Sequence, residues 1–491
     1  MGLKQNTAPF WEALLAYRSK GVVPFHTPGH KLRSGAFRRI DEVLGSGFFA
    51  LDPSDEIENA DLGHDFETAL QMAEQLAADL FGAKHSLFLV NGTTGGLHYL
   101  LMPVKGSVLI PRFSHQAVYS AMMLSQGRAV YLPPAYDVDW QIPLQPTVEQ
   151  MEQEMRRGGV EALVLTHPTY YGTVADLDRV ISCGRKHGTL VFVDEAHGGH
   201  FIFSDQLPQP ALQCGADAVV QSTHKTLGSF TQTSMLHANN EHWFAKAVQA
   251  QRVLQTTSPS LVFFAVLDEV RRILAEQGRR LVGQALELAW ECRRGLAKIE
   301  GVELLPQALQ GDPGKVVFSL RDLGLTGIEV ERTLRADYNI QVELSDYYSV
   351  LALVTLGDTP AGIERLTAAV KDLAGRRRHL GSRPLQRPKL DMPHLPPAVL
   401  TLREAFFAEK QFVSLAQAEG RISGGFLTPY PPGVPVIAPG EQFTPEIIEH
   451  LRWCIDINWT VRGLTAAQKV AVLEDNGRFC RTRKQGELHY A

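Results

Sequence analysis

Short apolar runs alternate with helical stretches through the middle of the chain, from Ala83 to Leu236. The runs are almost continuously apolar, which is typical of strands buried on both faces of a sheet. The stretches between them favour helices, and such alternation predicts a mostly parallel sheet with helices on both sides. The predicted strands are 86–90, 107–110, 129–132, 162–166, 190–193 and 218–220, and the predicted helices are 94–102, 115–126, 147–157 and 176–187.

The flanking segments follow other patterns. Amphipathic spacing predicts helices before the sheet, and a compact mixture of helices and strands after it. A basic, proline-rich stretch predicts a solvated linker, and a second proline-rich stretch predicts a rigid, extended loop. The predicted helices are 8–20, 67–81 (ending at Gly82), two within 241–300 separated at 255–259, 327–337 and 361–374; the strands are 316–320, 341–344 and 350–355; the linker is 376–397 and the loop 428–441.

These patterns divide the chain into five parts. We expect an N-terminal arm with loops that reach the site (1–66) and a large α/β domain (67–300). A small α+β domain (301–375), the linker (376–397) and a further small unit (398–491) follow.

Composition restricts the class of protein. The 491 residues are 44% hydrophobic and 21% charged, as in an ordinary globular protein. A formal net charge of −5 argues against nucleic acid or an anionic membrane surface as the main partner. The 5 cysteines are scattered and no apolar run approaches the length of a membrane span. We therefore expect a soluble cytoplasmic protein with reduced thiols and no metal site.

Two strand ends carry chemically informative residues, Asp194 and Lys225. A lysine in polar surroundings at the end of a buried strand can be desolvated and then form a Schiff base. A carboxylate facing a pyridine nitrogen keeps that nitrogen protonated. Either residue alone could have no catalytic role, because Lys225 could be a surface lysine and Asp194 could cap a helix. The two together, in this order, predict a site for pyridoxal 5'-phosphate (PLP).

Further polar motifs follow other predicted strands. Asn91–Gly96 opens a helix, where the hydroxyls of Thr93 and Thr94, with that of Ser222, offer a phosphate cradle. The alternative is that its glycines serve turn geometry alone. His115 begins a helix, so its imidazole either stacks on a flat ring or caps the helix. His167 and His197 lie at further strand ends, where a lone histidine is more often structural than catalytic.

With these motifs in place, the sequence resembles the ornithine/lysine/arginine decarboxylases of PLP fold type I, in their short bacterial form without an N-terminal wing domain. The resemblance covers nearly the whole chain. It implies an aspartate aminotransferase-like fold, with a mostly parallel seven-stranded sheet and smaller α+β C-terminal domains. The motifs that carry it are FHTPGHK (25–31), NGTTGG (91–96), PRFSHQ (111–116), HPTYYGTVADL (167–177), VDEAHGGH (193–200), STHKTLGSFTQTSML (222–236), TTSPS (256–260), VELSD (342–346) and YPPGVPVIAPGE (430–441).

The resemblance also implies roles for individual residues. Lys225 would bind PLP covalently, Asp194 would bind its pyridine nitrogen and His115 would stack on its ring. Thr93, Thr94 and Ser222 would hold the phosphate, and Thr256 would reach the phosphate of a neighbouring subunit, making a homodimer, or a higher homo-oligomer, with shared active sites. His197, where some relatives carry Trp, would lie near the phenolic oxygen, and His224 would donate a proton after carbon dioxide leaves.

The expected substrate is a basic amino acid: arginine, lysine or ornithine, giving agmatine, cadaverine or putrescine for polyamine biosynthesis. Aminotransferases of this fold hold the substrate carboxylate with an arginine, but residues 338–357 contain no arginine and do contain Glu343 and Asp346. These two carboxylates, with Glu441 and the acidic segment 52–65 as lesser candidates, are expected to bind the distal cation. Another fold type I enzyme, an aminotransferase or lyase, is the alternative, and a non-catalytic relative or a metal enzyme fits the residues less well.

Overall fold

A computed structural model describes residues 4–33, 35–45, 47–54, 65–381, 383–385, 393–430, 433–457 and 459–474. The acidic segment 52–65 therefore lies mainly outside the described residues.

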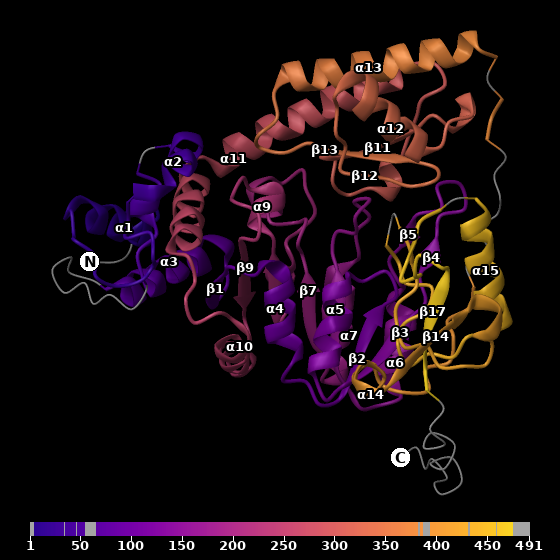
Figure 1. Cartoon of the computed structure of the whole chain (residues 1–491), viewed down its shortest axis with the longest axis horizontal. Helices are drawn as coiled ribbons and strands as arrows, with labels where there is room; N and C mark the ends of the chain where they lie inside the picture. Colours follow the sequence, from indigo (N-terminus) through magenta and orange to yellow (C-terminus); the bar gives the residue numbers. More distant parts are fainter. Residues whose placement is uncertain are drawn as a thin grey trace, which may run out of the picture.

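A sheet of seven strands forms the centre of the molecule (Figure 1). Its strand order is β1-β9-β8-β7-β6-β2-β3, and all the strands predicted between Ala83 and Leu236 are present, which confirms the predicted sheet. Among these seven, β9 alone runs in the direction opposite to the other six, and the sequence analysis missed it. The strands are β1 (His85–Leu89), β2 (Ser107–Pro111), β3 (Arg128–Leu132), β6 (Val160–Thr166), β7 (Leu190–Asp194), β8 (Ala218–Gln221) and β9 (Ser234–Ala238).

Helices cover both faces of this sheet because successive strand residues point to opposite sides. In β7, Val191 and Val193 belong to one apolar cluster, whereas Phe192 belongs to the other. The first cluster includes α1 (Pro9–Ser19), α3 (Phe66–Phe81), α6 (Val148–Arg156), α7 (Leu177–His187), α8 (Ala211–Cys214) and α11 (Leu261–Ala297). The second includes α4 (Gly92–Leu101), α5 (Gln116–Leu124) and α10 (Glu241–Leu254).

Local signals set the ends of the predicted helices. Helix α3 begins after Asp65, whose side chain accepts a hydrogen bond from the Thr68 N–H. It ends at Gly82, which has a φ of 74°, a left-handed conformation that glycine adopts without steric cost. This part of the chain also contains several short elements, which are α2 (Arg38–Leu44), the hairpin of β4 (Ala135–Tyr136) and β5 (Pro143–Leu144), and α9 (Thr223–Thr226).

Helix α11 is 37 residues long and joins two parts of the molecule. Its first half packs against α1, α3 and β1, and its second half against β10, β11 and α13 (Figure 1). In the first half, the fully buried Arg271 pairs with Asp268 at 2.7 Å and also donates to the carbonyl oxygens of Gln5 and Thr7. This buried ion pair holds the start of the chain against the large sheet.

A second, antiparallel sheet of four strands lies beyond α11, with its own apolar cluster. Its last helix continues to His379, so the expected linker at 376–397 starts too early. Four basic residues in the last turn, Arg376 to His379, suit the negative end of the helix dipole and extend the helix. The elements are β10 (Glu303–Leu304), β11 (Lys315–Ser319), α12 (Gly327–Tyr338), β12 (Leu344–Ser345), β13 (Val350–Leu353) and α13 (Pro360–His379).

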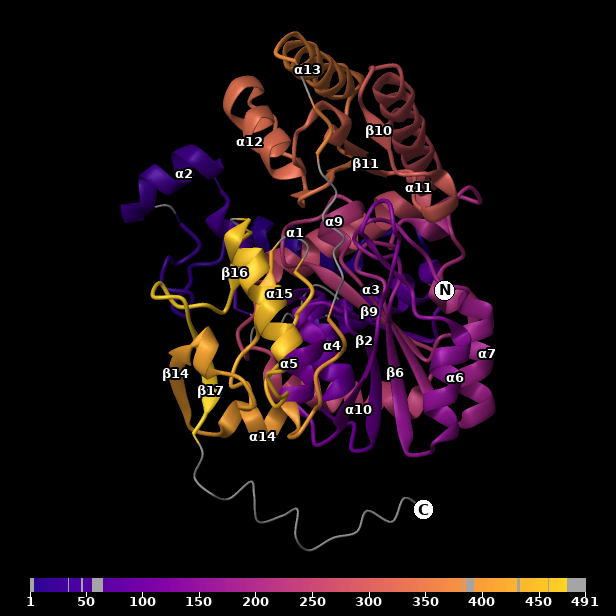
Figure 2. The same cartoon turned by 90° about the vertical axis from the view of Figure 1, so that its right-hand side faces the viewer.

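The C-terminal unit packs beside the large sheet, along the edge that carries β3 (Figure 1, Figure 2). It has a cluster of its own, and its Leu402 and Ala438 join the cluster that contains α5. Among the described helices, none has an apolar stretch long enough to traverse a lipid bilayer. The C-terminal elements are α14 (Leu402–Phe407), β14 (Lys410–Ser414), β15 (Thr428–Pro429), α15 (Pro445–Asp456), β16 (Val461–Arg462) and β17 (Lys469–Leu473).

Candidate active site

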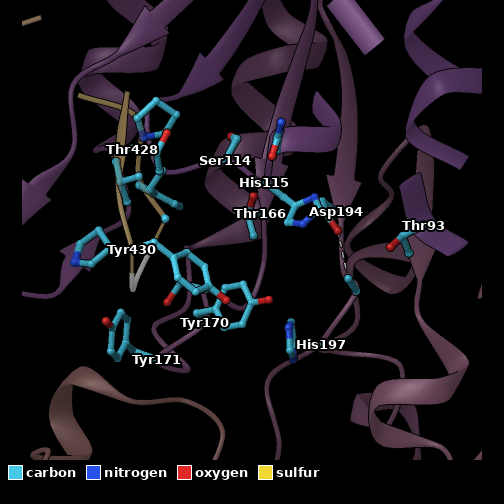
Figure 3. A pocket seen from close by; sticks show the side chains of 18 of the residues that line it. Thr93, Ser114, His115, Thr166, Tyr170, Tyr171, Asp194, His197, Thr428 and Tyr430 are labelled. Carbon is cyan, nitrogen blue, oxygen red and sulfur yellow. Dashed lines mark hydrogen bonds between the residues drawn. The ribbon is translucent and has the colours of Figure 1, made fainter. Parts of the chain in front are cut away.

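A cavity of about 510 Å³ opens at the carboxyl ends of the parallel strands. Strands β2, β6, β7 and β8 are parallel to one another, and β1 shares their direction because both β1 and β8 are antiparallel to β9. Ligand sites of open α/β sheets form at such an edge. The predicted residues Thr93, His115, Asp194, His197 and Lys225 all line the cavity. Figure 3 labels the first four of them.

Asp194 is the last residue of β7, and only 3% of its surface is exposed. The Ala196 N–H donates to one of its oxygens at 3.2 Å. Burial raises the pKa of Asp194, while the nearby His115 and Lys225 act to lower it. A buried carboxylate at this point has a strong tendency to pair with a cation, and a protonated pyridine nitrogen is such a cation.

Lys225 lies on the short helix α9, directly after β8. Its Nζ is 3.1 Å from His197 Nε2 and 5.8 Å from the centre of the Tyr170 ring. Burial lowers the pKa of Lys225, although Asp194 and Glu343 act in the opposite direction. An amine with a lowered pKa is neutral more often and is a better nucleophile toward an aldehyde.

His115 caps a helix, and its position also suits the stacking role that the sequence suggested. Its Nδ1 accepts a hydrogen bond of 3.1 Å from the Ala117 N–H, which caps α5. The cap fixes the ring orientation, and the ring lines the cavity beside Asp194 (Figure 3). Burial lowers the pKa of His115. The ring is therefore a largely neutral, fixed surface, which suits stacking on a flat heteroaromatic ligand.

A pair of hydroxyls marks another part of the site, where Thr93 Oγ1 lies 3.0 Å from Ser222 Oγ. Thr93 and Thr94 are in the first turn of α4, whose free N–H groups attract an anion. Gly96 allows the helix to approach the sheet, because a Cβ there would lie 2.8 Å from side-chain atoms of both Leu89 and Val220. The hydroxyls, the helix start, the buried acid and the amine together fit the phosphate, pyridine nitrogen and aldehyde of PLP.

His197 contacts two lysines, of which the sequence analysis missed one. Its Nε2 is 3.1 Å from Lys225 Nζ, and its Nδ1 is 3.0 Å from the Nζ of Lys315, at the start of β11. Lys315 has no exposed surface (0%), and burial lowers its pKa to about 8. The only available signal for Lys315 was its place at the head of an apolar strand, which identified no partner.

Two of the carboxylates expected to bind the substrate cation have other partners. Asp346 accepts hydrogen bonds from the Tyr171 hydroxyl at 2.6 Å and from both the backbone and the hydroxyl of Ser349. Glu441 forms a bidentate ion pair with Arg112, with two N–O distances of 2.7 Å. Neither is among the described residues that line the cavity. We therefore assign both to structure rather than to substrate recognition.

The other predicted residues are not among the described residues that line the cavity. Glu343 is exposed, yet its charge raises the pKa of Lys225, Lys315 and Tyr170, so it acts on the site through space. His224 is half-buried, and its Nδ1 lies 2.8 Å from the Thr233 carbonyl oxygen. Thr256 is on an exposed loop, where its hydroxyl accepts from the Ser258 N–H.

The C-terminal unit supplies one wall of the cavity, through Phe426, Thr428, Tyr430 and Arg462. In Figure 3, Thr428 and Tyr430 lie on the side opposite Thr93, with Asp194 and His115 between them. The guanidinium carbon of Arg462 lies 3.3 Å from the centre of the Tyr430 ring. The proline-rich sequence predicted a rigid loop here but no role in the site, because nothing local shows which surface a loop will cover.

The fold and the site together define a PLP-dependent enzyme of fold type I. The chain resembles the structure of a serine palmitoyltransferase of Sphingomonas wittichii, with a TM-score of 0.51, 17% identity, and 63% of this chain and 76% of that chain covered. It resembles the lysine decarboxylase of Francisella novicida over 95% of this chain and 81% of that chain, with a TM-score of 0.80 and 22% identity. Both likenesses concern the fold.

The sequence comparisons identify the family. Residues 8–312 match the major domain, and residues 392–481 the C-terminal domain, of the Orn/Lys/Arg decarboxylases. The chain is 35% identical to an arginine decarboxylase of Bacillus anthracis over 94% of its own length and 96% of that protein. The chain therefore belongs to the Orn/Lys/Arg decarboxylase family and is a PLP-dependent amino-acid decarboxylase, as the resemblance implied.

Proposed function

We propose that this protein decarboxylates L-arginine to agmatine and carbon dioxide, in the cytoplasm and as a step of polyamine synthesis. The observation that carries the choice of substrate is the 35% identity to an arginine decarboxylase over nearly the full length of both chains. The lysine decarboxylase that shares the fold is only 22% identical. The exposed carboxylate of Glu343, whose charge acts on the site lysines, supports a cationic substrate.

Each group of the site has a task in this reaction. PLP, when bound, supplies a cationic ring that accepts the electron pair of the breaking carbon–carbon bond. Lys225 provides the amine that holds the cofactor aldehyde, and Asp194 keeps a proton on the pyridine nitrogen. His115 supports the ring face, while Thr93, Thr94 and Ser222 hold the phosphate. Because His224 Nδ1–H donates a hydrogen bond to the Thr233 carbonyl oxygen, His224 Nε2 remains for proton exchange.

The direct test incubates purified protein and PLP with L-arginine, L-lysine and L-ornithine in separate reactions. We expect agmatine and carbon dioxide from arginine, detected by mass spectrometry and by trapping of labelled carbon dioxide. The Lys225→Ala variant is the matched negative control. Cadaverine or putrescine as the main product would move the substrate assignment to lysine or ornithine, and a keto acid would favour the aminotransferase alternative.

We also propose a homodimer with shared active sites, in which Thr256 of each subunit approaches the cofactor phosphate of the other. Large apolar side chains are exposed along the N-terminal arm, including Val23 (63%), Phe25 (94%) and Val43 (79%), and Val253 (69%) is exposed near Thr256. Exposed apolar surface of this extent is characteristic of an interface. A second copy of the chain is the partner that the exposed position of Thr256 supports.

Subunit mixing tests this arrangement. Lys225→Ala and Thr256→Asp should each be inactive as pure dimers, the second because it places a negative charge beside the phosphate. After co-refolding, a mixed dimer would contain one intact site, so about a quarter of the wild-type activity should return. A mass corresponding to one chain in light scattering, or a mixture without activity, would contradict shared sites.

A further inference from the structure

The contact of Lys315 with His197 assigns a task to a lysine that the reaction described above does not use. His197 is fully buried, and burial lowers its pKa well below the usual value, so its imidazole is neutral. A neutral imidazole has one N–H and one lone pair. Both nitrogens of His197 nevertheless face lysine amines, Lys315 at Nδ1 (3.0 Å) and Lys225 at Nε2 (3.1 Å).

This geometry constrains the protons. An ammonium group only donates hydrogen bonds, whereas a neutral amine also accepts one. If both lysines were charged, the imidazole N–H would face an ammonium N–H. The hydrogen bonds that join Lys315, His197 and Lys225 can therefore all form when one lysine is charged and the other is neutral.

We propose that Lys315 is a positioning residue: as the charged member it donates to His197 Nδ1, and so directs the His197 Nε2 proton toward the amine of Lys225. The Lys225 amine is then the acceptor, and it is held in the neutral form that attacks the cofactor aldehyde. In that attack the nitrogen lone pair forms the new bond to carbon, and the aldehyde oxygen leaves as water, taking up the two protons that the amine nitrogen gives up. This inference rests on the proposed function only in that Lys225 is the lysine that binds PLP.

The surroundings of Lys315 support a positive charge on this lysine. The carboxylate of Asp312, in the loop before β11, acts to keep Lys315 protonated, as does Glu343 ahead of β12, while Lys225 acts against it. The pKa of about 8 that results leaves Lys315 mostly charged at neutral pH. The Tyr170 ring, 6.0 Å from its Nζ, adds a face that attracts a cation.

Before the cofactor binds, Lys225 has a similar balance. Its charge is supported by Asp194 and Glu343 and opposed by burial. Asp194 is also the residue that pairs with the pyridine nitrogen, and this pairing uses the same negative charge. Binding of the cofactor therefore shifts Lys225 toward the neutral form, while Asp312 continues to support the charge of Lys315, and this difference makes Lys315 the charged member of the pair.

The experiment measures how fast the cofactor-free protein captures PLP covalently, as a function of pH and without any amino-acid substrate. Capture is followed by the visible absorbance of the bound cofactor, and borohydride reduction with mass spectrometry locates it on Lys225. Lys315→Met should raise the pKa of Lys225 by about one unit and slow capture at neutral pH about tenfold, with less effect in alkali. Lys315→Gln, which keeps an N–H donor for Nδ1, should recover part of the rate.

Two further variants complete the test. Lys246→Met removes a lysine that lies against Trp243 on α10, and it should capture PLP like the wild type. Asp312→Asn should slow capture at neutral pH less than Lys315→Met does, and it provides the test if the Lys315 variants do not fold. A folded Lys315→Met protein with the wild-type rate and pH profile, or an Asp312→Asn protein with an unchanged profile, overturns the assignment. If the wild type captures PLP in this way yet forms no agmatine, the proposed substrate fails and this inference stands.

Discussion

The ion pair between Arg112 and Glu441 connects the large sheet to the C-terminal unit, and Glu441→Gln tests what it does. Both side chains are almost inaccessible, with exposures of 3% and 1%. Arg112 also donates to the carbonyl oxygens of Pro435 and Val436, so one guanidinium holds the loop that forms a wall of the cavity. Burial acts to lower the pKa of Arg112, but the facing Glu441 and two nearby tyrosines raise it, so the arginine stays charged.

The expected loss of stability follows from that buried charge. Glutamine fills the same space but leaves the cation of Arg112 without its counter-ion, and removing one partner of a buried pair costs about 3–5 kcal/mol. Replacing both members, as Arg112→Met with Glu441→Leu, removes the unpaired charge. We expect this double variant to be more stable than the sum of its single changes predicts, by about 1–3 kcal/mol.

Urea unfolding, followed by fluorescence, measures these changes. The exposed pair of Glu154 and Arg157 provides the control, because Glu154→Gln should cost at most about 1 kcal/mol. If Glu441 instead bound the substrate cation, Glu441→Gln would raise KM for arginine and leave the urea midpoint unchanged. A loss of stability no larger than that of the Glu154 control would refute the structural role.

Further predictions concern buried acids near the site. Asp194→Asn should still bind PLP but lower kcat for arginine by about two orders of magnitude or more, measured in steady-state assays, because a neutral amide does not hold the ring proton. Burial raises the pKa of Glu195 to about 8, so the folded protein retains a proton that the unfolded chain loses above its ordinary value of 4.5. Stability should therefore fall as pH rises from about 4.5 to 8, and the slope of urea midpoint against pH should be smaller in Glu195→Gln. Tyr171→Phe removes the 2.6 Å hydrogen bond to the buried Asp346 and should cost about 1–3 kcal/mol in the same urea assay.

The sequence predicted the parts of the site that follow strands, since a parallel sheet brings strand ends to one edge. Asp194, Lys225, His115 and Thr93 were found in this way, and the structure places all four around one cavity. Strand β9 was missed because it is short, follows a polar stretch after Lys225 and pairs antiparallel, against the pattern of the other strands.

Pairings between distant segments could not be predicted from local patterns. Asp346 and Glu441 were interpreted as substrate carboxylates because the sequence does not show that Tyr171 and Arg112 reach them across 175 and 329 positions. Lys315 was overlooked for the same reason, since its partner His197 lies 118 positions away. An acidic or basic residue shows its charge in the sequence, but only the fold shows what neutralises it.

The continuous helix α11 has a mechanical consequence. It belongs to the packing of both sheets, so tilting the small sheet away would bend or break an uninterrupted ladder of main-chain hydrogen bonds. His197 follows a strand of one sheet and Lys315 begins a strand of the other, so such a tilt would also separate these two side chains. The helix that joins the two sheets therefore also keeps the contact between His197 and Lys315 in place.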